Sequence, residues 1–146
     1  MNDRPILIQG GRIIDPDRQM DQIGDLLIID GKIQQCGDTV QEMPPETHVI
    51  NAMGWVISPG FIDLHCHLRE PGYEYKETIA TGTKAAARGG FTLVCCMPNT
   101  NPPLDCGATV EFVLKRARET GSVRVAPIGC VTRGRKGKEL ANLIEL

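Results

Sequence analysis

The chain has 146 residues, of which 41% are hydrophobic and 23% charged, and its formal net charge is −2. This composition is typical of a globular protein and excludes a fibrous or fully disordered chain. Because the charge is nearly balanced and no run approaches the ~20 apolar residues that cross a bilayer, we expect a cytoplasmic protein without a nucleic-acid or membrane partner.

Residues 1–57 are predicted to form a β-rich segment. Short apolar runs separated by turn residues predict its first strands, which are Ile6–Gln9, Arg12–Ile14, Asp25–Ile29 and Lys32–Gln35. Asp30-Gly31 stands between two of these runs and predicts a tight hairpin, because a type I′ turn requires positive φ at both central residues. Residues 47–57 predict one or two further strands, and His48 within them is interpreted as a surface or packing residue.

Residues 58–146 change to an alternation of strands and helices. The predicted elements, in chain order, are a strand at Phe61–Leu68, a helix at Tyr75–Arg88, a strand at Phe91–Met97, a helix at Cys106–Thr120, a strand at Val123–Val131 and the start of a helix at Lys138–Leu146. Continuous apolar strands joined by helices are typical of a parallel sheet that is buried on both faces.

Three strand-helix units do not close a barrel, which normally needs eight units and about 250 residues. The alternatives are a small three-unit sheet or the front portion of a larger α/β enzyme. Leu140, Leu143, Ile144 and Leu146 would give the last predicted helix an apolar face with no further strand to cover. We therefore expect the first three βα units of an incomplete (β/α)8 barrel.

The run His65-Cys66-His67 ends the first strand of this second region. Strand side chains alternate between faces, so His65 and His67 are expected on one side and Cys66 on the other. Imidazole is a common ligand of zinc, and a catalytic zinc keeps a position open for water. We therefore predict that His65 and His67 are metal ligands. Asp63 shares their parity and is interpreted as a residue that orients a ligand imidazole or the local backbone.

Six cysteines occur, but no Cys-x-x-Cys pair, and Cys95 and Cys96 are adjacent within an apolar run. We expect them to be reduced, small buried hydrophobes rather than a disulfide framework. The basic run at residues 133–138 lacks the glycine and the hydroxyl residue of a phosphate-binding loop and is expected to be a solvated surface loop.

Two separated segments carry a family resemblance. Residues 59–72 read Pro-Gly-Phe-Ile-Asp-Leu-His-Cys-His-Leu-Arg-Glu-Pro-Gly, and residues 96–103 read Cys-Met-Pro-Asn-Thr-Asn-Pro-Pro. The first resembles the opening barrel strand of the metal-dependent amidohydrolases, and of dihydroorotase in particular. The second resembles the second-strand motif of the same enzymes.

This resemblance implies a zinc-dependent cyclic amide hydrolase that interconverts N-carbamoyl-L-aspartate and dihydroorotate in pyrimidine biosynthesis, with one or two Zn²⁺ ions per complete subunit. Residues 1–57 would then belong to a small β-sandwich. His65 and His67 match the first two metal ligands, Arg69 the residue that grips the substrate carboxylate, and Asn99 a second substrate contact. An arginine fork suits a carboxylate, and an amide can both donate and accept.

The resemblance also implies a bridging acid or carboxylated lysine, two further histidines and an aspartate general acid and base, none of which we locate in this chain. We therefore predict that the chain alone turns over little or no substrate. Two alternatives remain open, namely a catalytically silent subunit that scaffolds aspartate transcarbamoylase and a related allantoinase or dihydropyrimidinase. A complete protein is expected to be a homo-oligomer.

Overall fold

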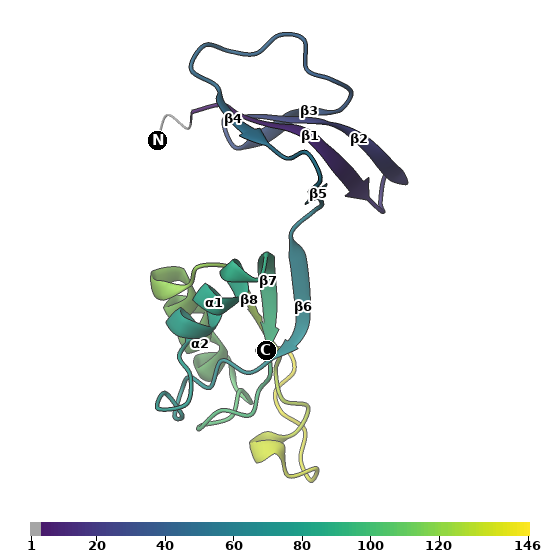
Figure 1. The fold of residues 1–146 in the computed structure, drawn as a ribbon. Coiled ribbons are helices and arrows are strands. Elements are labelled where there is room, and N and C mark those ends of the chain that lie inside the picture. Colours follow the sequence, from purple (N-terminus) through teal and green to yellow (C-terminus); the bar gives the residue numbers. More distant parts are fainter. Residues whose placement is uncertain (1–3) are drawn as a thin grey trace. The chain divides into compact units, whose positions relative to one another are not determined.

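The computed structural model describes residues 4–146. They form two compact units, one ending at Pro59 and the other spanning Gly60–Leu146. Each unit has its own sheet (Figure 1). Each also has its own cluster of buried apolar side chains. The second unit holds every residue predicted to take part in a site.

The first unit is a single mixed sheet with the strand order β3-β2-β1-β4, in which β5 also pairs with β1. Its strands are β1 (Ile6–Asp15), β2 (Met20–Ile29), β3 (Lys32–Gly37), β4 (His48–Asn51) and β5 (Val56–Ile57). β2 runs antiparallel to both β1 and β3, whereas β4 and β5 run parallel to β1. Within residues 4–59 no second sheet faces this one, so only one layer of the predicted β-sandwich is seen.

The prediction of two separate strands at Ile6–Gln9 and Arg12–Ile14 is wrong, because β1 runs through both. A register shift near Gly10, whose φ is +71°, lets the strand bulge and continue. The buried carboxylate of Asp25 holds this bulge by accepting a hydrogen bond from the Gly10 N–H at 2.9 Å, and its other oxygen accepts one from the Val40 N–H at 2.9 Å. Isolated apolar runs do not reveal such a bulge.

The hairpin prediction is confirmed. β2 and β3 pair in antiparallel fashion across Asp30 and Gly31, whose φ values are +50° and +69°. Both are positive, as a type I′ turn requires. The further strand or two expected from residues 47–57 are β4 and β5, and His48 is an exposed residue of β4.

The second unit is a three-stranded parallel sheet in the order β6-β7-β8. Its elements are β6 (Phe61–Cys66), α1 (Ile79–Arg88), β7 (Phe91–Cys96), α2 (Gly107–Thr120), β8 (Arg124–Pro127) and the 3₁₀ turn η1 (Arg133–Arg135). Both helices lie on the same side of the sheet (Figure 1). The core between the helices and the sheet includes Ile79, Val94 and Val113. The predicted parallel sheet with helical connections is confirmed, whereas closure into a barrel lies beyond these three strands.

The boundaries of α1 differ from the prediction at its beginning. The helix was expected from Tyr75 but begins at Ile79, because Thr78 acts as the N-cap and forms a reciprocal capping box with Thr81. Its end agrees with the prediction, since Gly89 is the C-cap. α2 agrees at both ends, with Cys106 as its N-cap and Gly121 as its C-cap.

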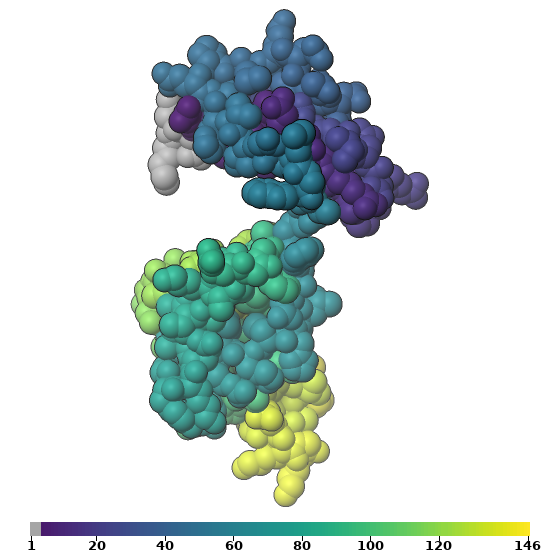
Figure 2. All heavy atoms as spheres, in the orientation of Figure 1, coloured from purple at the N-terminus to yellow at the C-terminus, as the bar shows by residue number. Residues whose placement is uncertain are grey.

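The third predicted helix, at Lys138–Leu146, is wrong. The segment instead folds back on the residues that follow β8, with an isolated bridge between Thr132 and Leu140 and a hydrogen bond of 2.9 Å from the Ala141 N–H to the Val131 carbonyl. Leu140, Leu143 and Ile144 are exposed, so no packing partner stabilises a helix here. Figure 2 shows this last part of the chain, in yellow, protruding from the second unit. The unit therefore contains two complete βα units and a third strand.

The cysteine prediction is confirmed in part, because all six residues are free but only Cys96 and Cys130 are buried, and the other four are partly buried. Cys66 and Cys96 belong to the core of the second unit. The helices among residues 4–146 include none that is long and apolar enough to cross a membrane.

Candidate metal and substrate site

The paired histidines lie at the carboxyl end of β6. His65 lies inside the strand, whereas His67 follows Cys66, the last residue of the strand. The strand therefore ends two residues before the predicted end at Leu68. The two imidazole rings nevertheless lie side by side, with 5.3 Å between their centroids and 68° between their planes. Both side chains are exposed and can reach a common ligand.

Asp63 holds the strand end in place. Its Oδ1 accepts a hydrogen bond from the His65 backbone N–H at 3.0 Å. This contact agrees with the interpretation that Asp63 orients the local backbone. The carboxylate therefore supports His65 through the main chain rather than through the imidazole ring.

Asn99 is brought next to His67 from the loop that follows β7. Its Oδ1 lies 2.9 Å from His67 Nδ1. An amide oxygen only accepts hydrogen bonds, so Nδ1 must carry the proton and Nε2 keeps its lone pair. A neutral imidazole with one nitrogen donating and the other free is the form that binds metals. Sequence reasoning named both residues but missed this contact, because nothing in a linear sequence pairs two loops.

Close approach of two loops makes that contact possible. The Asn101 N–H donates to the Pro71 carbonyl at 3.0 Å, which ties the loop after β7 to the loop after β6. Gly72 sits at this junction with φ of +93°, and a Cβ there would lie only 2.0 Å from the Asn101 carbonyl oxygen. A glycine is therefore required where the two loops meet.

Arg69 lies two residues beyond His67 and is partly exposed. Its backbone adopts a φ of +64°, in the left-handed region. Among the residues that the structure describes, its guanidinium has no ion-pair or hydrogen-bond partner. A guanidinium without a partner can receive an anionic group.

The donor set fits a metal ion only in part. Two imidazoles suit zinc, but residues 4–146 contain no cluster of three or more His, Cys, Asp or Glu side chains that could complete its coordination. Cys66 does not add a ligand, since it packs against the core and burial raises the pKa of its thiol to about 11. This chain can therefore supply two ligands of a zinc site.

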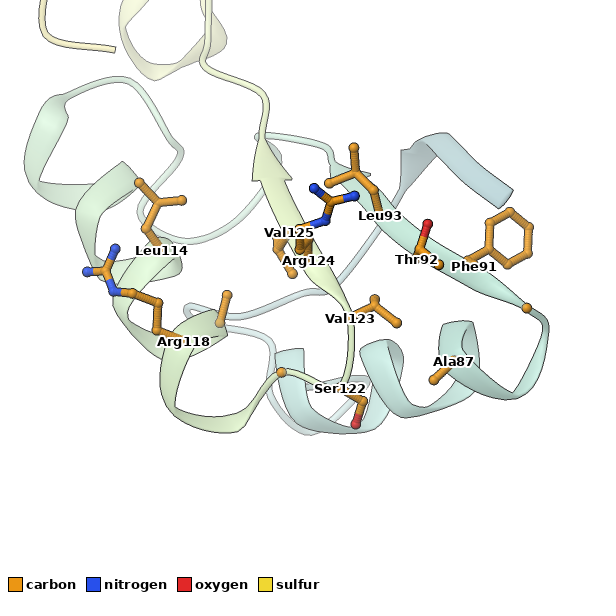
Figure 3. A pocket seen from close by; sticks show the side chains of 13 residues that line it. Ala87, Phe91, Thr92, Leu93, Leu114, Arg118, Ser122, Val123, Arg124 and Val125 are labelled. Carbon is orange, nitrogen blue, oxygen red and sulfur yellow. The ribbon is translucent and has the colours of Figure 1, made fainter. Parts of the chain in front are cut away.

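One cavity lies away from this site. It has a volume of about 850 Å³ and lies between the ends of α1 and α2 and the beginnings of β7 and β8, lined mainly by apolar side chains with Arg118 and Arg124 (Figure 3). In parallel α/β folds the chemistry is found at the carboxyl ends of strands, which is the opposite end. A smaller cavity of about 240 Å³ is lined in part by His67 and Asp63.

The parallel sheet with the histidine pair at the end of its first strand places the structure in the class of the hydantoinase fold. The structure resembles D-hydantoinase (dihydropyrimidinase) from Thermus sp., with a TM-score of 0.70 and 30% identity over 87% of this chain and 28% of that one.

The family is narrower than this class. A family model described as Dihydro-orotase-like matches residues 54–146, and the chain belongs to this family. It is 48% identical over 138 residues to a dihydroorotase of Caldicellulosiruptor saccharolyticus, covering 94% of this chain and 32% of that protein. It is also 50% identical over 141 residues to a dihydroorotase of Anaeromyxobacter sp. (strain K), covering 97% and 32%. The chain thus spans about a third of the length of these relatives.

Proposed function

We propose that this chain forms the opening part of a zinc-dependent dihydroorotase, which interconverts N-carbamoyl-L-aspartate and (S)-dihydroorotate. The observation that carries the proposal is the pair of adjacent imidazoles, His65 and His67, followed two residues later in the chain by Arg69. It is supported by relatives of 48% and 50% identity that are themselves dihydroorotases.

Each residue has a role that its chemistry suits. His65 and His67 would bind the metal through their free ring nitrogens, and Asn99 would fix the tautomer of His67 while its remaining amide group faces the substrate. Arg69 would bind the substrate carboxylate with its planar fork of donors. Zinc, when bound, supplies Lewis acidity for the ring amide carbonyl and for a water molecule.

The remaining groups are expected outside this chain. Residues 4–146 contain no group of three or more His, Cys, Asp or Glu side chains that could hold a metal. We accordingly propose no catalytic residue here, and we expect a complete site with one or two zinc ions in a polypeptide of the relatives' length and only weak zinc binding by this chain.

The biological setting is part of the same proposal. Ring closure of carbamoyl aspartate is a step of de novo pyrimidine (UMP) synthesis, and the ligand is a small anionic molecule. A homo-oligomer in the cytoplasm is expected, with aspartate transcarbamoylase as a candidate partner. A silent scaffold for that partner is disfavoured because both histidines and Arg69 are present.

A dihydropyrimidinase or allantoinase activity is the second candidate. It is favoured by the structural similarity to a hydantoinase (dihydropyrimidinase), at 30% identity. The dihydroorotase relatives are more similar in sequence, and Arg69 is positioned for a carboxylate that hydantoin, allantoin and dihydrouracil do not carry.

A fusion tests the function directly. The chain is joined in frame to the part of the Caldicellulosiruptor saccharolyticus dihydroorotase that follows the matching third. Hydrolysis of dihydroorotate, hydantoin, allantoin and dihydrouracil is then compared in the presence of zinc, together with an Arg69→Met variant. We expect dihydroorotate to be the preferred substrate and Arg69→Met to weaken its binding. Preference for an uncharged ring, unaffected by Arg69→Met, would overturn the assignment.

A further inference from the structure

The backbone of Arg69 forms a tight turn that an arginine does not favour. The Glu70 N–H donates to the Leu68 carbonyl at 2.8 Å, which closes a three-residue turn around Arg69 at its φ of +64°. A residue with a Cβ is disfavoured in the left-handed region because the Cβ comes too close to the backbone carbonyl. Such a conformation persists only where neighbouring contacts hold it.

The residues on either side of Arg69 provide these contacts. Leu68 is 5% exposed and belongs to the core of the second unit, and Glu70 is also only 5% exposed. The Arg69 carbonyl accepts a hydrogen bond from the Tyr73 N–H at 3.1 Å. Arg69 is thus the partly exposed residue between two buried anchors, which directs its side chain away from the core.

Glu70 is anchored at both carboxylate oxygens. Oε2 accepts a hydrogen bond from the Ile79 N–H, the first helical residue of α1, at 2.9 Å. Oε1 accepts one from Arg116 Nε of α2 at 2.8 Å, which is also a salt bridge. A single buried carboxylate therefore joins the turn to both helices of the unit.

Capping of α1 does not by itself explain Glu70. Glu70 accepts from the Ile79 N–H, which the Thr78–Thr81 capping box leaves open, because that box satisfies only the N–H groups of Thr78 and Thr81. The contact that capping leaves unexplained is the ion pair with Arg116, which lies 46 residues further along the chain. Such a long-range tie serves to fix the position of a loop.

We propose that Glu70 and Arg116 are positioning residues, which hold the turn so that the Arg69 guanidinium faces the substrate carboxylate. This inference rests on the proposed function for the identity of the ligand, whereas the mechanical tie itself does not depend on it. The pair neither contacts the histidines nor binds the substrate.

The first test uses hydrogen exchange on the 146-residue chain itself. In Glu70→Gln one oxygen is replaced by an NH₂ group, so the side chain cannot accept from both Ile79 and Arg116. We expect the Tyr73 amide, which reports the Arg69 turn, to exchange about tenfold faster in Glu70→Gln and Arg116→Gln. The matched control is Arg118→Gln, on the same helix, whose pair with Glu111 is exposed at 62% and 63%. Unchanged exchange at Tyr73 in both variants would overturn the proposal, whether or not any activity is found.

The second test uses the fusion described above. Glu70→Gln is expected to raise KM for dihydroorotate about tenfold with kcat nearly unchanged, because weaker ground-state and transition-state binding raises KM alone. We expect the amount of zinc bound by the fusion protein to be unchanged in Glu70→Gln. We also expect Glu70→Gln to have no further effect on KM when Arg69 has already been replaced in Arg69→Met. A KM increase that persists without Arg69, or a loss of zinc, would show a merely structural role and refute the proposal. An inactive parent fusion would instead count against the proposed function, and the exchange result would still decide the positioning role.

Discussion

At the scale of single residues, the hydrogen bond between His67 Nδ1 and Asn99 Oδ1 decides which ring nitrogen is available. Outer contacts of this kind typically change metal affinity 10–100-fold when removed. We predict that Asn99→Ala weakens zinc binding about tenfold in the chain, measured by competition with a chromogenic chelator. Removing the amide leaves the imidazole free to adopt either tautomer.

The control for this prediction is Asn101→Ala. Asn101 lies on the same loop and is exposed, and among residues 4–146 its side chain has no hydrogen-bond partner, so its substitution should leave zinc affinity unchanged. Equal affinities for all three proteins would mean that the His67–Asn99 contact does not support metal binding.

Cys96 gives a second prediction at this scale. Burial is the main reason that the pKa of its thiol is raised to about 12. A raised pKa means less thiolate at a given pH, and at pH 8 the reactive fraction is on the order of 10⁻⁴. We expect Cys96 to resist alkylation by iodoacetamide in the folded chain at pH 8 and to react once urea unfolds it, as located by peptide mass spectrometry. Rapid labelling of Cys96 without urea would contradict its burial.

The individual site residues could be found from the sequence to different degrees. His65 and His67 are identified by their spacing, since a period of two residues places them on one side even though the strand ends between them. The anchoring of Glu70 by Arg116 could not be found, because a contact across 46 residues depends on how two helices pack.

At the scale of elements, the beginning of α1 is set by its cap. The Thr78 Oγ1 accepts from the Thr81 N–H at 3.1 Å, and the Thr81 Oγ1 accepts from the Thr78 N–H at 3.1 Å. Removing an N-cap hydroxyl costs about 1 kcal/mol. Thr78→Ala is therefore expected to increase hydrogen exchange of the first-turn amides of α1 about fivefold. Lys84→Ala, at an exposed position of the same helix, serves as the control, and equal exchange in both variants would contradict the capping role.

Elements were predictable where local chemistry decides them. The predicted hairpin at Asp30-Gly31 and the predicted end of α1 at Arg88 were correct, because turn residues impose these features directly. The start of α1 was placed too early because an alanine-rich pattern was extended past its threonine cap. The helix expected at Lys138–Leu146 failed for a different reason, since an apolar stripe forms a helix only when something covers it.

At the scale of the whole molecule, the chain covers about a third of its dihydroorotase relatives. The edge strand β6 exposes Ile62 at 55% and Leu64 at 73%. Among the residues described, the second unit forms a sheet of three parallel strands, so the alternation of strands and helices predicts the class of fold, and closure of the sheet is not seen.

The incomplete donor set leads to the last prediction. With two imidazoles from this chain, and no group of three or more metal-binding side chains among residues 4–146, most of a zinc ion's coordination would be left to water. We therefore expect residues 1–146 alone to show no measurable cyclisation of N-carbamoyl-L-aspartate with added zinc, while retaining weak zinc binding that His65→Ala reduces. Turnover is followed by the appearance of dihydroorotate, with the fusion protein as the positive control. Robust activity of the chain alone, abolished by His65→Ala, would show that the missing ligands are dispensable and that these two histidines are sufficient for the chemistry.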